Sequence, residues 1–357
     1  MSALKQRILG LIRAQGPMSI AQYMQMALLD PFGGYYALRD PFGRDFVTAP
    51  EVSQIFGELI GLFFVQAWED RGRPAPFHLV ELGPGRGTLM ADMMRAAAKV
   101  RPEFAEAARI VLLEASPLLR SVQANTLKDH SPRWVLRLDE VPRDAPLFLI
   151  ANEFFDALPV RQFVKCADGW RERMLGAQED ALRFVLAPDK APASLIPEQF
   201  RGAGEGAVFE VNASAIALAG EIARRVARSG GAALIVDYGH AESGLGDTFQ
   251  AVKANAFADP LAEPGEADLT AHVDFAALAQ AARDADSLVF GPAPQGEFLE
   301  MLGARLRAER LKNAAPARAA EIDAAVERLT SPAQMGTLFK VMALAAPSSP
   351  PLPGFPC

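Results

Sequence analysis

The sequence is poor in the residues from which metal centres and disulfide frameworks are built. Its 357 residues include two cysteines and four histidines, and the cysteines lie far apart, at positions 166 and 357. This spacing fits neither a zinc site nor a disulfide framework, and it favours a reducing compartment. The chain also lacks any run of about 18 uninterrupted apolar residues, so we expect no membrane span.

An excess of positive charge is also absent. Lysine and arginine number 36 against 43 aspartates and glutamates, which gives a net charge of −7. This balance argues against a general binder of nucleic acid or membrane surfaces, although it leaves room for a local basic patch. Half of the residues are hydrophobic and 22% are charged, which is typical of a globular protein with a substantial core.

Four short apolar segments in the middle of the chain have the composition of buried strands. They are rich in Leu, Ile and Val, and each leads into polar residues and a loop: 77–82, 109–114, 147–151 and 232–237. A helical segment, 88–100, follows the first of them. Apolar runs that alternate with helices predict a parallel sheet covered on both faces, and ligands bind at the carboxyl ends of such strands.

The first of these segments leads directly into a glycine-rich turn, VELGPGRGTLM. Gly83, Gly85 and Gly87 follow Glu81, where the strand gives way to the helix. A P-loop is excluded because no Gly-Lys-Ser/Thr follows, and a dinucleotide turn would require glycine where the chain has Thr88. The observed Glu-x-Gly-x-Gly-x-Gly spacing is that of class I methyltransferases, which bind S-adenosylmethionine.

Two acids give a physical reason to prefer this cofactor. S-adenosylmethionine carries a positive sulfur and an amino group that Glu81 would stabilise, whereas a carboxylate would repel a pyrophosphate. Glu114 ends the second apolar segment, where it can accept hydrogen bonds from both ribose hydroxyls; alternatively, it is a surface residue that caps the next helix, at Ser116-Pro117. The predicted cofactor site consists of Glu81, Gly83, Pro84, Gly85, Gly87, Thr88, Glu114 and, near the adenine, Asp139.

A second polar cluster follows the third apolar segment, in ANEFFDALPVRQF. Asn152, Glu153 and Asp156 lie within five residues, in a loop that faces the transferable methyl group in class I methyltransferases. Two neighbouring carboxylates can hold a guanidinium through paired hydrogen bonds and leave its attacking nitrogen more nucleophilic. Methyl transfer then requires alignment of the lone pair with the methyl group and an acceptor for the proton. Alternatively, Asn152 or Asp156 simply caps the turn.

Two further polar segments are weaker candidates. Asp237 ends the fourth apolar segment, and Tyr238 and His240 follow it; these residues could line the substrate side, although a lone histidine in a loop is more often structural than catalytic. In the segment 268–274, polar residues alternate as metal ligands would. That segment contains a threonine, a poor ligand, and Asp274 suits a helix N-cap, so we predict no metal site.

Composition and patterning divide the chain into four predicted parts. They are an N-terminal helical and loop segment (1–70), a core (71–250) with a β-type insertion near 170–212, a mainly helical part that completes the core (251–345), and a disordered Pro-rich tail (346–357).

Long motifs in several of these parts resemble the MidA family of S-adenosylmethionine-dependent methyltransferases, which occur in bacteria and mitochondria and are linked to respiratory complex I assembly. The matching segments are VELGPGRGTL, ANEFFDALPV, VDYGH, DLTAHVDF, MGTLFKVMAL and the early RDPFGRDFVTAPEVSQIFGELIG. The resemblance implies an α/β fold, a class I methyltransferase (Rossmann-like) sheet with helical N- and C-terminal additions. It also implies symmetric dimethylation of an arginine on a complex I (NADH dehydrogenase) subunit.

The resemblance adds residues near the N-terminus to the site. Thr48, Pro50 and Glu51 belong to a segment that would close over the cofactor, so Glu51 joins the predicted cofactor site. One departure from the family pattern is Arg44, where glycine is expected before Asp45. This departure concerns the tip of the loop and not the chemistry.

The sequence thus predicts a protein arginine N-methyltransferase with Asn152, Glu153 and Asp156 as its catalytic residues. The resemblance implies a cytoplasmic location in bacteria and the mitochondrial matrix for related eukaryotic proteins. Two alternatives stay open: methylation of a small molecule or another protein side chain, and a non-catalytic assembly factor that binds a complex I subunit. The sequence leaves the oligomeric state open.

Overall fold

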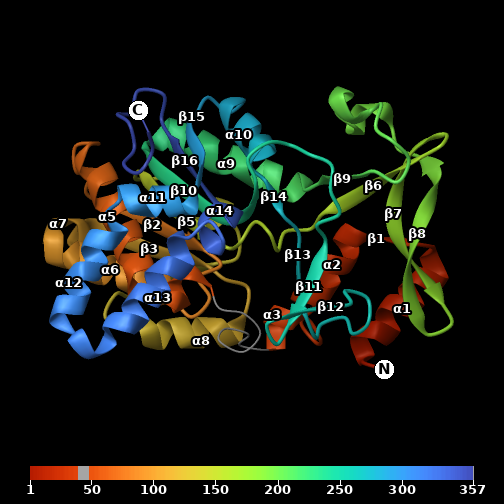
Figure 1. Ribbon diagram of the computed structural model, residues 1–357, viewed down its shortest axis with the longest axis horizontal. Helices are drawn as coiled ribbons and strands as arrows, with labels where there is room; N and C mark the ends of the chain where they lie inside the picture. The colour runs from red at the N-terminus through yellow and green to blue at the C-terminus, as the bar shows by residue number, and fades with distance from the viewer. Residues whose placement is uncertain (39–47, 357) are drawn as a thin grey trace. The chain divides into compact units, whose positions relative to one another are not determined.

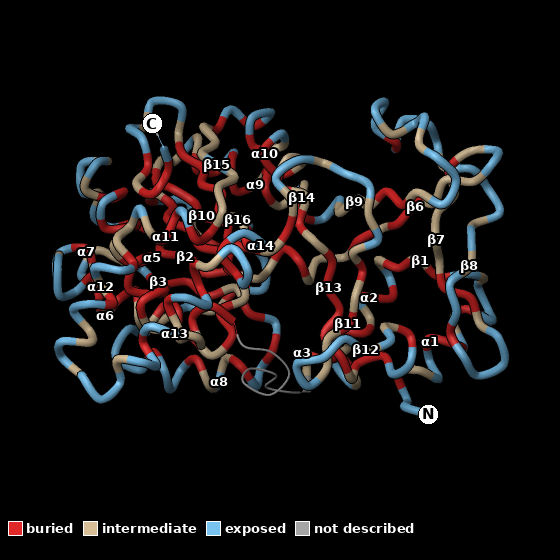
Figure 2. The backbone as a smooth tube through the Cα atoms, viewed as in Figure 1, coloured by how far each residue is buried: buried red, intermediate tan, exposed pale blue. Residues whose placement is uncertain are grey.

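The computed structural model describes residues 1–38 and 48–356, and the chain folds into two compact units. Unit 1 contains residues 1–46, 156–216 and 243–272, and unit 2 contains residues 47–155, 217–242 and 273–357. Each unit has its own buried core (Figure 2). These boundaries differ from the predicted linear division, because each unit is assembled from three separate segments. The departure at Arg44 lies outside the described residues.

Unit 2 is built around a sheet whose central strands are parallel (Figure 1), as predicted. The strand order is β15-β16-β10-β5-β2-β3-β4. The parallel strands are β4 (Arg133–Val135), β3 (Ala108–Leu113), β2 (Phe77–Leu82), β5 (Leu147–Asn152) and β10 (Gly231–His240). The antiparallel strands are β16 (Phe339–Ala345) and β15 (Leu288–Pro294), and the short β14 (Val273–Asp274) pairs with β10.

The central strands form because their residues are apolar on both faces. All six residues of β2 and all six of β5 are buried, which requires cover on both sides of the sheet. The helices of this unit are α4 (Ala49–Val52), α5 (Gln54–Glu69), α6 (Thr88–Val100), α7 (Pro102–Ala107), α8 (Pro117–Thr126), α9 (Ala213–Ser229, from residue 217 on), α10 (Phe275–Arg283), α11 (Gln295–Met301), α12 (Ala304–Ala314), α13 (Ala319–Thr330) and α14 (Met335–Leu338). No helix in the described residues is long and apolar enough to cross a membrane.

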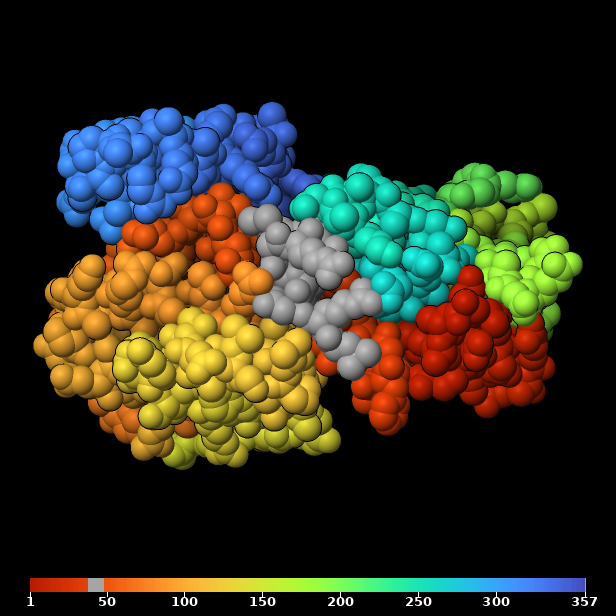
Figure 3. Space-filling view, turned by 90° about the horizontal axis from the view of Figure 1, so that it is seen from below, coloured from red at the N-terminus to blue at the C-terminus, as the bar shows by residue number. Residues whose placement is uncertain are grey.

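Helix α5 is buried along most of its length and carries one buried acid, Glu58. The Glu58 carboxylate accepts hydrogen bonds from Arg95 of α6 and Arg307 of α12, each at 2.6 Å. Burial alone would raise the pKa of Glu58, but these two guanidinium groups outweigh burial and lower it. Arg307 thus fastens α12 to α5 through the buried Glu58 carboxylate, and in Figure 3 the C-terminal helices lie beside the segment that contains α4 and α5.

Unit 1 combines two small sheets with N-terminal helices. The larger sheet has the order β1-β7-β6-β9, with β8 paired to β7, and the smaller has the order β12-β11-β13. Its strands are β1 (Met18–Ser19), β6 (Arg161–Cys166), β7 (Gly169–Gln178), β8 (Ala181–Lys190), β9 (Val208–Val211), β11 (Gln250–Lys253), β12 (Ala256–Ala258) and β13 (Asp268–Thr270); its helices are α1 (Ala3–Gln15), α2 (Ile20–Leu29) and α3 (Tyr35–Leu38). Ser19 begins α2 with a capping box that includes Gln22.

The Pro-rich C-terminal tail differs from the predicted disordered segment. Leu352 and Phe355 are only 2% and 6% exposed and belong to the core of unit 2. The Phe355 ring lies 5.2 Å from that of Phe298 and 6.1 Å from that of Phe290, measured between centroids. Two apolar side chains in a short proline-rich segment are enough to order it, because each finds a ready-made apolar surface.

Replacement of Phe355 by alanine tests the packing of the tail. We expect Phe355→Ala to lower the free energy of unfolding by roughly 3 kcal/mol, because it removes a buried ring and leaves a cavity. Urea denaturation measures the change. Pro356→Ala, at an exposed neighbouring position, should have little effect, and equal stability of the two variants would show that the tail does not pack.

Candidate active site at the carboxyl ends of the parallel strands

The carboxyl ends of β3, β2, β5 and β10 lie next to one another along one edge of the unit 2 sheet. Leu82 of β2 pairs with Leu113 of β3 and with Ala151 of β5. Asn152, the last residue of β5, pairs with Val236 of β10. The glycine turn after β2, the segment after β3 and the loop after β5 therefore begin side by side, at the edge where parallel sheets bind ligands.

The glycine turn between β2 and α6 needs glycine for its backbone conformation. The φ angles are +60° at Gly83, +54° at Gly85 and +82° at Gly87, a region that side chains with a Cβ rarely adopt. The N–H of Gly87 donates to the carbonyl of the buried Pro84 at 2.7 Å. Gly87 is also the N-cap of α6 and has no side chain to cap it, so the turn presents backbone N–H groups at the sheet edge.

Glu81, the acid beside the turn, is buried and differs in charge from the sequence expectation. It is 3% exposed, and its Oε2 atom has no hydrogen-bond partner among the described residues. Burial raises the pKa of Glu81 to about 8, the negative charge of Glu114 adds to the rise, and a backbone hydrogen bond from Met90 opposes it. Glu81 is therefore largely protonated at neutral pH until a positive group lies beside it.

Glu114 faces inward, and a buried glutamine links it to the glycine turn. Its Oε1 atom accepts the Ser116 N–H at 2.7 Å, and its Oε2 atom accepts the Gln123 amide at 3.0 Å. The same Gln123 amide donates to the Gly85 carbonyl at 2.7 Å. Burial raises the pKa of Glu114, although these hydrogen bonds oppose the shift. The alternative of a surface cap does not hold: Glu114 is 7% exposed, and Ser116 is the N-cap of α8. The Glu114 carboxylate is buried beside the turn, where the site requires it.

Gln123 is a site residue that the sequence did not predict. Its side chain is completely buried, and its carbonyl accepts a hydrogen bond from the Trp134 indole at 2.8 Å. It lies in the amphipathic helix α8, where a glutamine ordinarily faces solvent, so no sequence signal separates it from a surface residue. Only the packing of α8 against the glycine turn gives the amide its role.

The loop after β5 holds Glu153 in an unusual conformation. Glu153 has a φ of +50°, and its N–H donates to the Val236 carbonyl at 2.9 Å. Its Oε1 atom accepts the Ala49 N–H at 2.9 Å and the Asn152 side-chain amide at 3.3 Å. A non-glycine residue in this region is strained, and such strain often occurs at functional sites. Asn152 and Glu153 therefore share one hydrogen-bonded group at the sheet edge.

Asp237, in the last part of β10, fixes the backbone of this loop. It is 0% exposed, and its Oδ2 atom accepts the N–H groups of Phe154 and Phe155 at 3.1 and 2.9 Å. Its Oδ1 atom accepts the Tyr238 N–H at 2.9 Å. This burial differs from the predicted place of Asp237 on the substrate side, because its carboxylate is directed at backbone N–H groups. Tyr238 and His240 stay partly accessible.

The short helix α4 connects the glycine turn to the loop after β5. Its Ala49 N–H bonds Glu153, as above, and its Glu51 carboxylate accepts the Thr88 hydroxyl at 2.6 Å. Thr88 is the first residue of α6, directly after the turn. Thr48 and Pro50 are buried beside them. Helix α4 thus contacts both the loop after β5, through Glu153, and the start of α6 directly after the glycine turn, through Thr88.

The predicted site residues do not all belong to one unit. Asn152 and Glu153 are in unit 2, whereas Asp156 begins a segment of unit 1. Within unit 1 the Tyr36 hydroxyl donates to Asp268 at 2.7 Å. Burial raises the pKa of Tyr36, and the negative charges of Asp268 and Asp156 add to this. Asp156 and Asp268 thus both act electrostatically on the Tyr36 hydroxyl within unit 1.

The segment predicted not to bind metal contains no ligand cluster in the described residues. Asp268 and Thr270 are buried on β13, and Asp274 is the N-cap of α10, whose carboxylate accepts the Ala277 N–H at 3.0 Å. The N-cap position is the alternative that the sequence favoured. The His272 N–H donates to the Thr248 hydroxyl at 2.9 Å.

Asp139, predicted to lie near the adenine, follows β4 in a 3-10 turn over Leu138–Glu140. Its side chain is 43% exposed and accepts a hydrogen bond from the Arg137 guanidinium at 2.9 Å. Arg225 of α9 donates to the carbonyl of Leu138 at 3.2 Å, and this hydrogen bond connects the 3-10 turn to α9.

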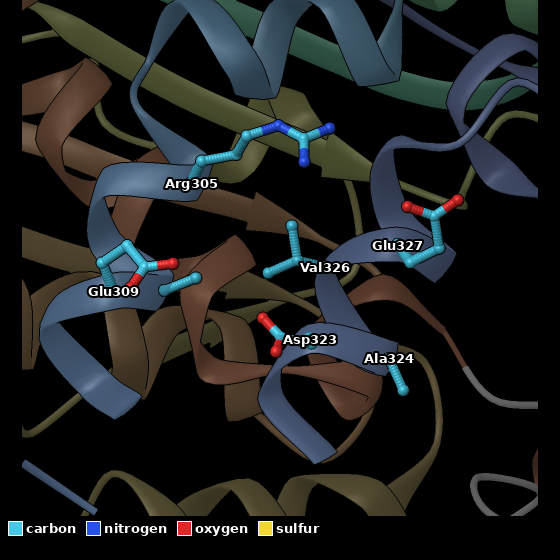
Figure 4. Close-up of a pocket in the computed structure, with 7 residues that line it drawn as sticks. Arg305, Glu309, Asp323, Ala324, Val326 and Glu327 are labelled. Atoms are coloured by element: carbon cyan, nitrogen blue, oxygen red, sulfur yellow. The ribbon is translucent and has the colours of Figure 1, made fainter. Parts of the chain in front are cut away.

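A hollow of about 440 Å³ lies elsewhere in unit 2, between α12 and α13 (Figure 4). Its lining comes from these two helices alone and includes Arg305, Glu309, Asp323 and Glu327. Lys312 pairs with Glu309 and Asp323, both at 2.7 Å. The hollow is therefore a gap between two helices that are linked by charged side chains. Its lining contains no residue of the predicted site.

Comparison with known proteins matches the chain to methyltransferases. A family model for S-adenosyl-L-methionine-dependent methyltransferases matches residues 59–293. The Drosophila melanogaster homolog of protein arginine methyltransferase NDUFAF7, a mitochondrial protein, is 38% identical over 374 residues, which cover 96% of this chain and 84% of the relative. The human protein arginine methyltransferase NDUFAF7, also mitochondrial, is 36% identical over 363 residues, 93% of this chain and 81% of the relative.

Solved structures agree with this match along the whole chain. A Burkholderia thailandensis protein crystallised with S-adenosyl-homocysteine is 30% identical, with a TM-score of 0.85 and coverage of 99% of this chain and 94% of that one. A native structure from the same organism is 28% identical, with a TM-score of 0.86 and the same coverage. The α/β fold is thus confirmed, and the cofactor is S-adenosyl-L-methionine.

Replacement of Glu81 by glutamine tests its buried, protonated state. Burial raises the pKa of Glu81 from 4.5 to about 8, so its contribution to stability is complete below about pH 4.5 and is lost as the pH rises through about 8. The wild-type free energy of unfolding, measured by urea denaturation without cofactor, should fall by up to about 1.4 kcal/mol per pH unit across this range. It should fall less in Glu81→Gln, which cannot ionise.

The exposed Glu103→Gln variant is the control, since its pH dependence should follow the wild type. Parallel curves for wild type and Glu81→Gln would mean that Glu81 ionises normally in the folded chain and would contradict the assignment.

Proposed function

Because this chain belongs to the S-adenosyl-L-methionine-dependent methyltransferase family that includes the NDUFAF7 proteins, we propose that it is a protein arginine N-methyltransferase. Its product is symmetric dimethylarginine, and its substrate is a subunit of respiratory complex I. The names of its relatives support arginine as the acceptor, and the motifs that resemble the MidA family support the complex I subunit. We expect the bacterial cytoplasm as its location; the relatives compared above are mitochondrial.

The residues at the sheet edge fit the cofactor chemically. S-adenosylmethionine supplies a methyl group on a positively charged sulfur. The turn from Gly83 to Gly87, together with Pro84 and Thr88, offers backbone N–H groups and lets the cofactor approach the backbone closely. The Glu114 carboxylate offers oxygens to the ribose hydroxyls. The Oε2 atom of Glu81, which has no hydrogen-bond partner within residues 1–38 and 48–356, is available to a positive group, and that group would favour ionisation of Glu81. Asp139 is the proposed adenine neighbour, and Glu51 supports Thr88 from α4.

The geometry of Glu153 carries the proposed chemistry. Its carboxylate is half-buried at the sheet edge, and the Ala49 N–H and the Asn152 amide fix its orientation. A carboxylate held in this way can accept a hydrogen bond from a guanidinium and draw its charge toward one side. The nitrogen on the other side is then the better nucleophile for in-line transfer, and a carboxylate can also receive the proton that it releases. Asn152 acts as the positioning residue for Glu153.

The remaining predicted residues have subordinate roles in this proposal. Asp156 is a second acid for the cationic substrate, assigned from its place three residues after Glu153. Tyr238 and His240, both partly accessible, contact the substrate polypeptide rather than the reacting atoms. Asp237 holds the loop and does not contact the substrate.

Replacement of Glu153 by glutamine tests the proposed chemistry. We expect Glu153→Gln to lower kcat by about 100-fold or more, because the amide neither accepts a proton nor localises the guanidinium charge. The affinity for S-adenosylmethionine should change little. The assay uses radiolabelled S-adenosylmethionine with a purified quinone-side subunit of complex I, and mass spectrometry identifies the methylated residue.

The control is Glu106→Gln, at an exposed position of α7. Methyl transfer to another residue type or to a small molecule would replace the proposed substrate. Stable binding of the subunit with no methyl transfer by the wild type would identify a non-catalytic assembly factor.

A further inference from the structure

An aromatic side chain occupies the space that the first glycine of the turn leaves open. A Cβ atom added to Gly83 would come within 2.7 Å of Cδ2 in the Phe154 ring. The missing side chain at this position thus makes room for the protein's own aromatic ring, in addition to permitting a φ of +60°. Phe154 comes from the loop after β5, so its ring packs across the boundary between β5 and β2 at the sheet edge.

The backbone that carries this ring is firmly held. The N–H groups of Phe154 and Phe155 both bond the completely buried carboxylate of Asp237. The Phe155 ring, itself buried, meets the Phe154 ring edge to face at 5.9 Å between centroids. Phe154 itself stays partly exposed. The ring is therefore fixed against Gly83 while part of its surface remains accessible.

The order of the strands indicates which part of the cofactor would lie against this ring. Glu114, which suits the ribose, follows β3, and Glu153 follows β5; β2 lies between these two strands. A cofactor with its ribose at Glu114 and its methyl group directed at the loop after β5 would have its sulfur near the end of β2. Gly83 and the Phe154 ring lie at that point.

We propose that Phe154 recognises the positive charge of the sulfur through the face of its ring, and so distinguishes S-adenosylmethionine from its neutral product S-adenosylhomocysteine. A cation over an aromatic face is attracted by the ring quadrupole, and a neutral thioether is not. The preference favours binding of the donor and release of the product. This inference rests on the cofactor placement given under the proposed function and not on the proposed arginine substrate.

Isothermal titration calorimetry with the two ligands tests the inference. The quantity measured is the ratio of Kd for S-adenosylhomocysteine to Kd for S-adenosylmethionine. We expect Phe154→Leu to lower this ratio roughly two- to fivefold, the size of an ordinary cation–π preference. Phe154→Tyr keeps an aromatic face and should keep the ratio. Phe290→Leu removes a ring on β15, far along the sheet order from β2, and should also keep it.

Equal loss of affinity for both ligands in Phe154→Leu would show that the ring acts by packing alone and would overturn the inference, as would an unchanged ratio. Thermal melting establishes that each variant is folded. Should Phe154→Leu fail to fold, Phe154→Met fills a similar space without an aromatic face and should show the same lowered ratio. These titrations contain no protein substrate, so failure of the proposed arginine methylation leaves their outcome unaffected.

Discussion

The buried carboxylate of Asp237 is the contact on which the candidate site depends. By accepting the N–H groups of Phe154, Phe155 and Tyr238, it satisfies three backbone donors that would otherwise be costly to bury. The same contacts fix the loop after β5. That loop in turn places the Phe154 ring on Gly83 and fixes the backbone just after the strained Glu153.

A chain of hydrogen bonds connects this loop to the cofactor turn by a second route. Glu153 bonds the start of α4 at Ala49, and α4 returns through Glu51 to Thr88, the first residue of α6. Helix α4 also packs on α13, and α12 is fastened to α5 through Arg307 and Glu58. The C-terminal helices therefore support the segment that joins the two halves of the site. This arrangement explains why helices distant in sequence from the glycine turn complete the same unit.

Buried glutamates in this unit have pKa values that shift in opposite directions, and their partners explain the difference. Glu58 has two arginines, which lower its pKa despite burial. In the part of the chain that the structure describes, Glu81 and Glu114 accept hydrogen bonds only from neutral groups, and the charge of Arg120 near Glu114 does not outweigh burial, so burial raises the pKa of both. From its sequence context, Glu81 is expected to be a carboxylate that stabilises a positive cofactor. The structure adds that the positive group itself would favour its ionisation, in the way that the arginines do for Glu58.

The sequence by itself determined the features that depend on local pattern. Apolar runs predicted the parallel strands, the glycine spacing predicted the turn and its cofactor, and long motifs predicted the family. Tertiary structure alone decided which polar groups are buried and what they contact. It gave Gln123 its place between Glu114 and Gly85, turned Asp237 inward and ordered the tail through Phe355. Periodicity and spacing are properties of neighbouring residues, whereas burial, and with it the charge of Glu81, depends on segments that meet only when the chain has folded.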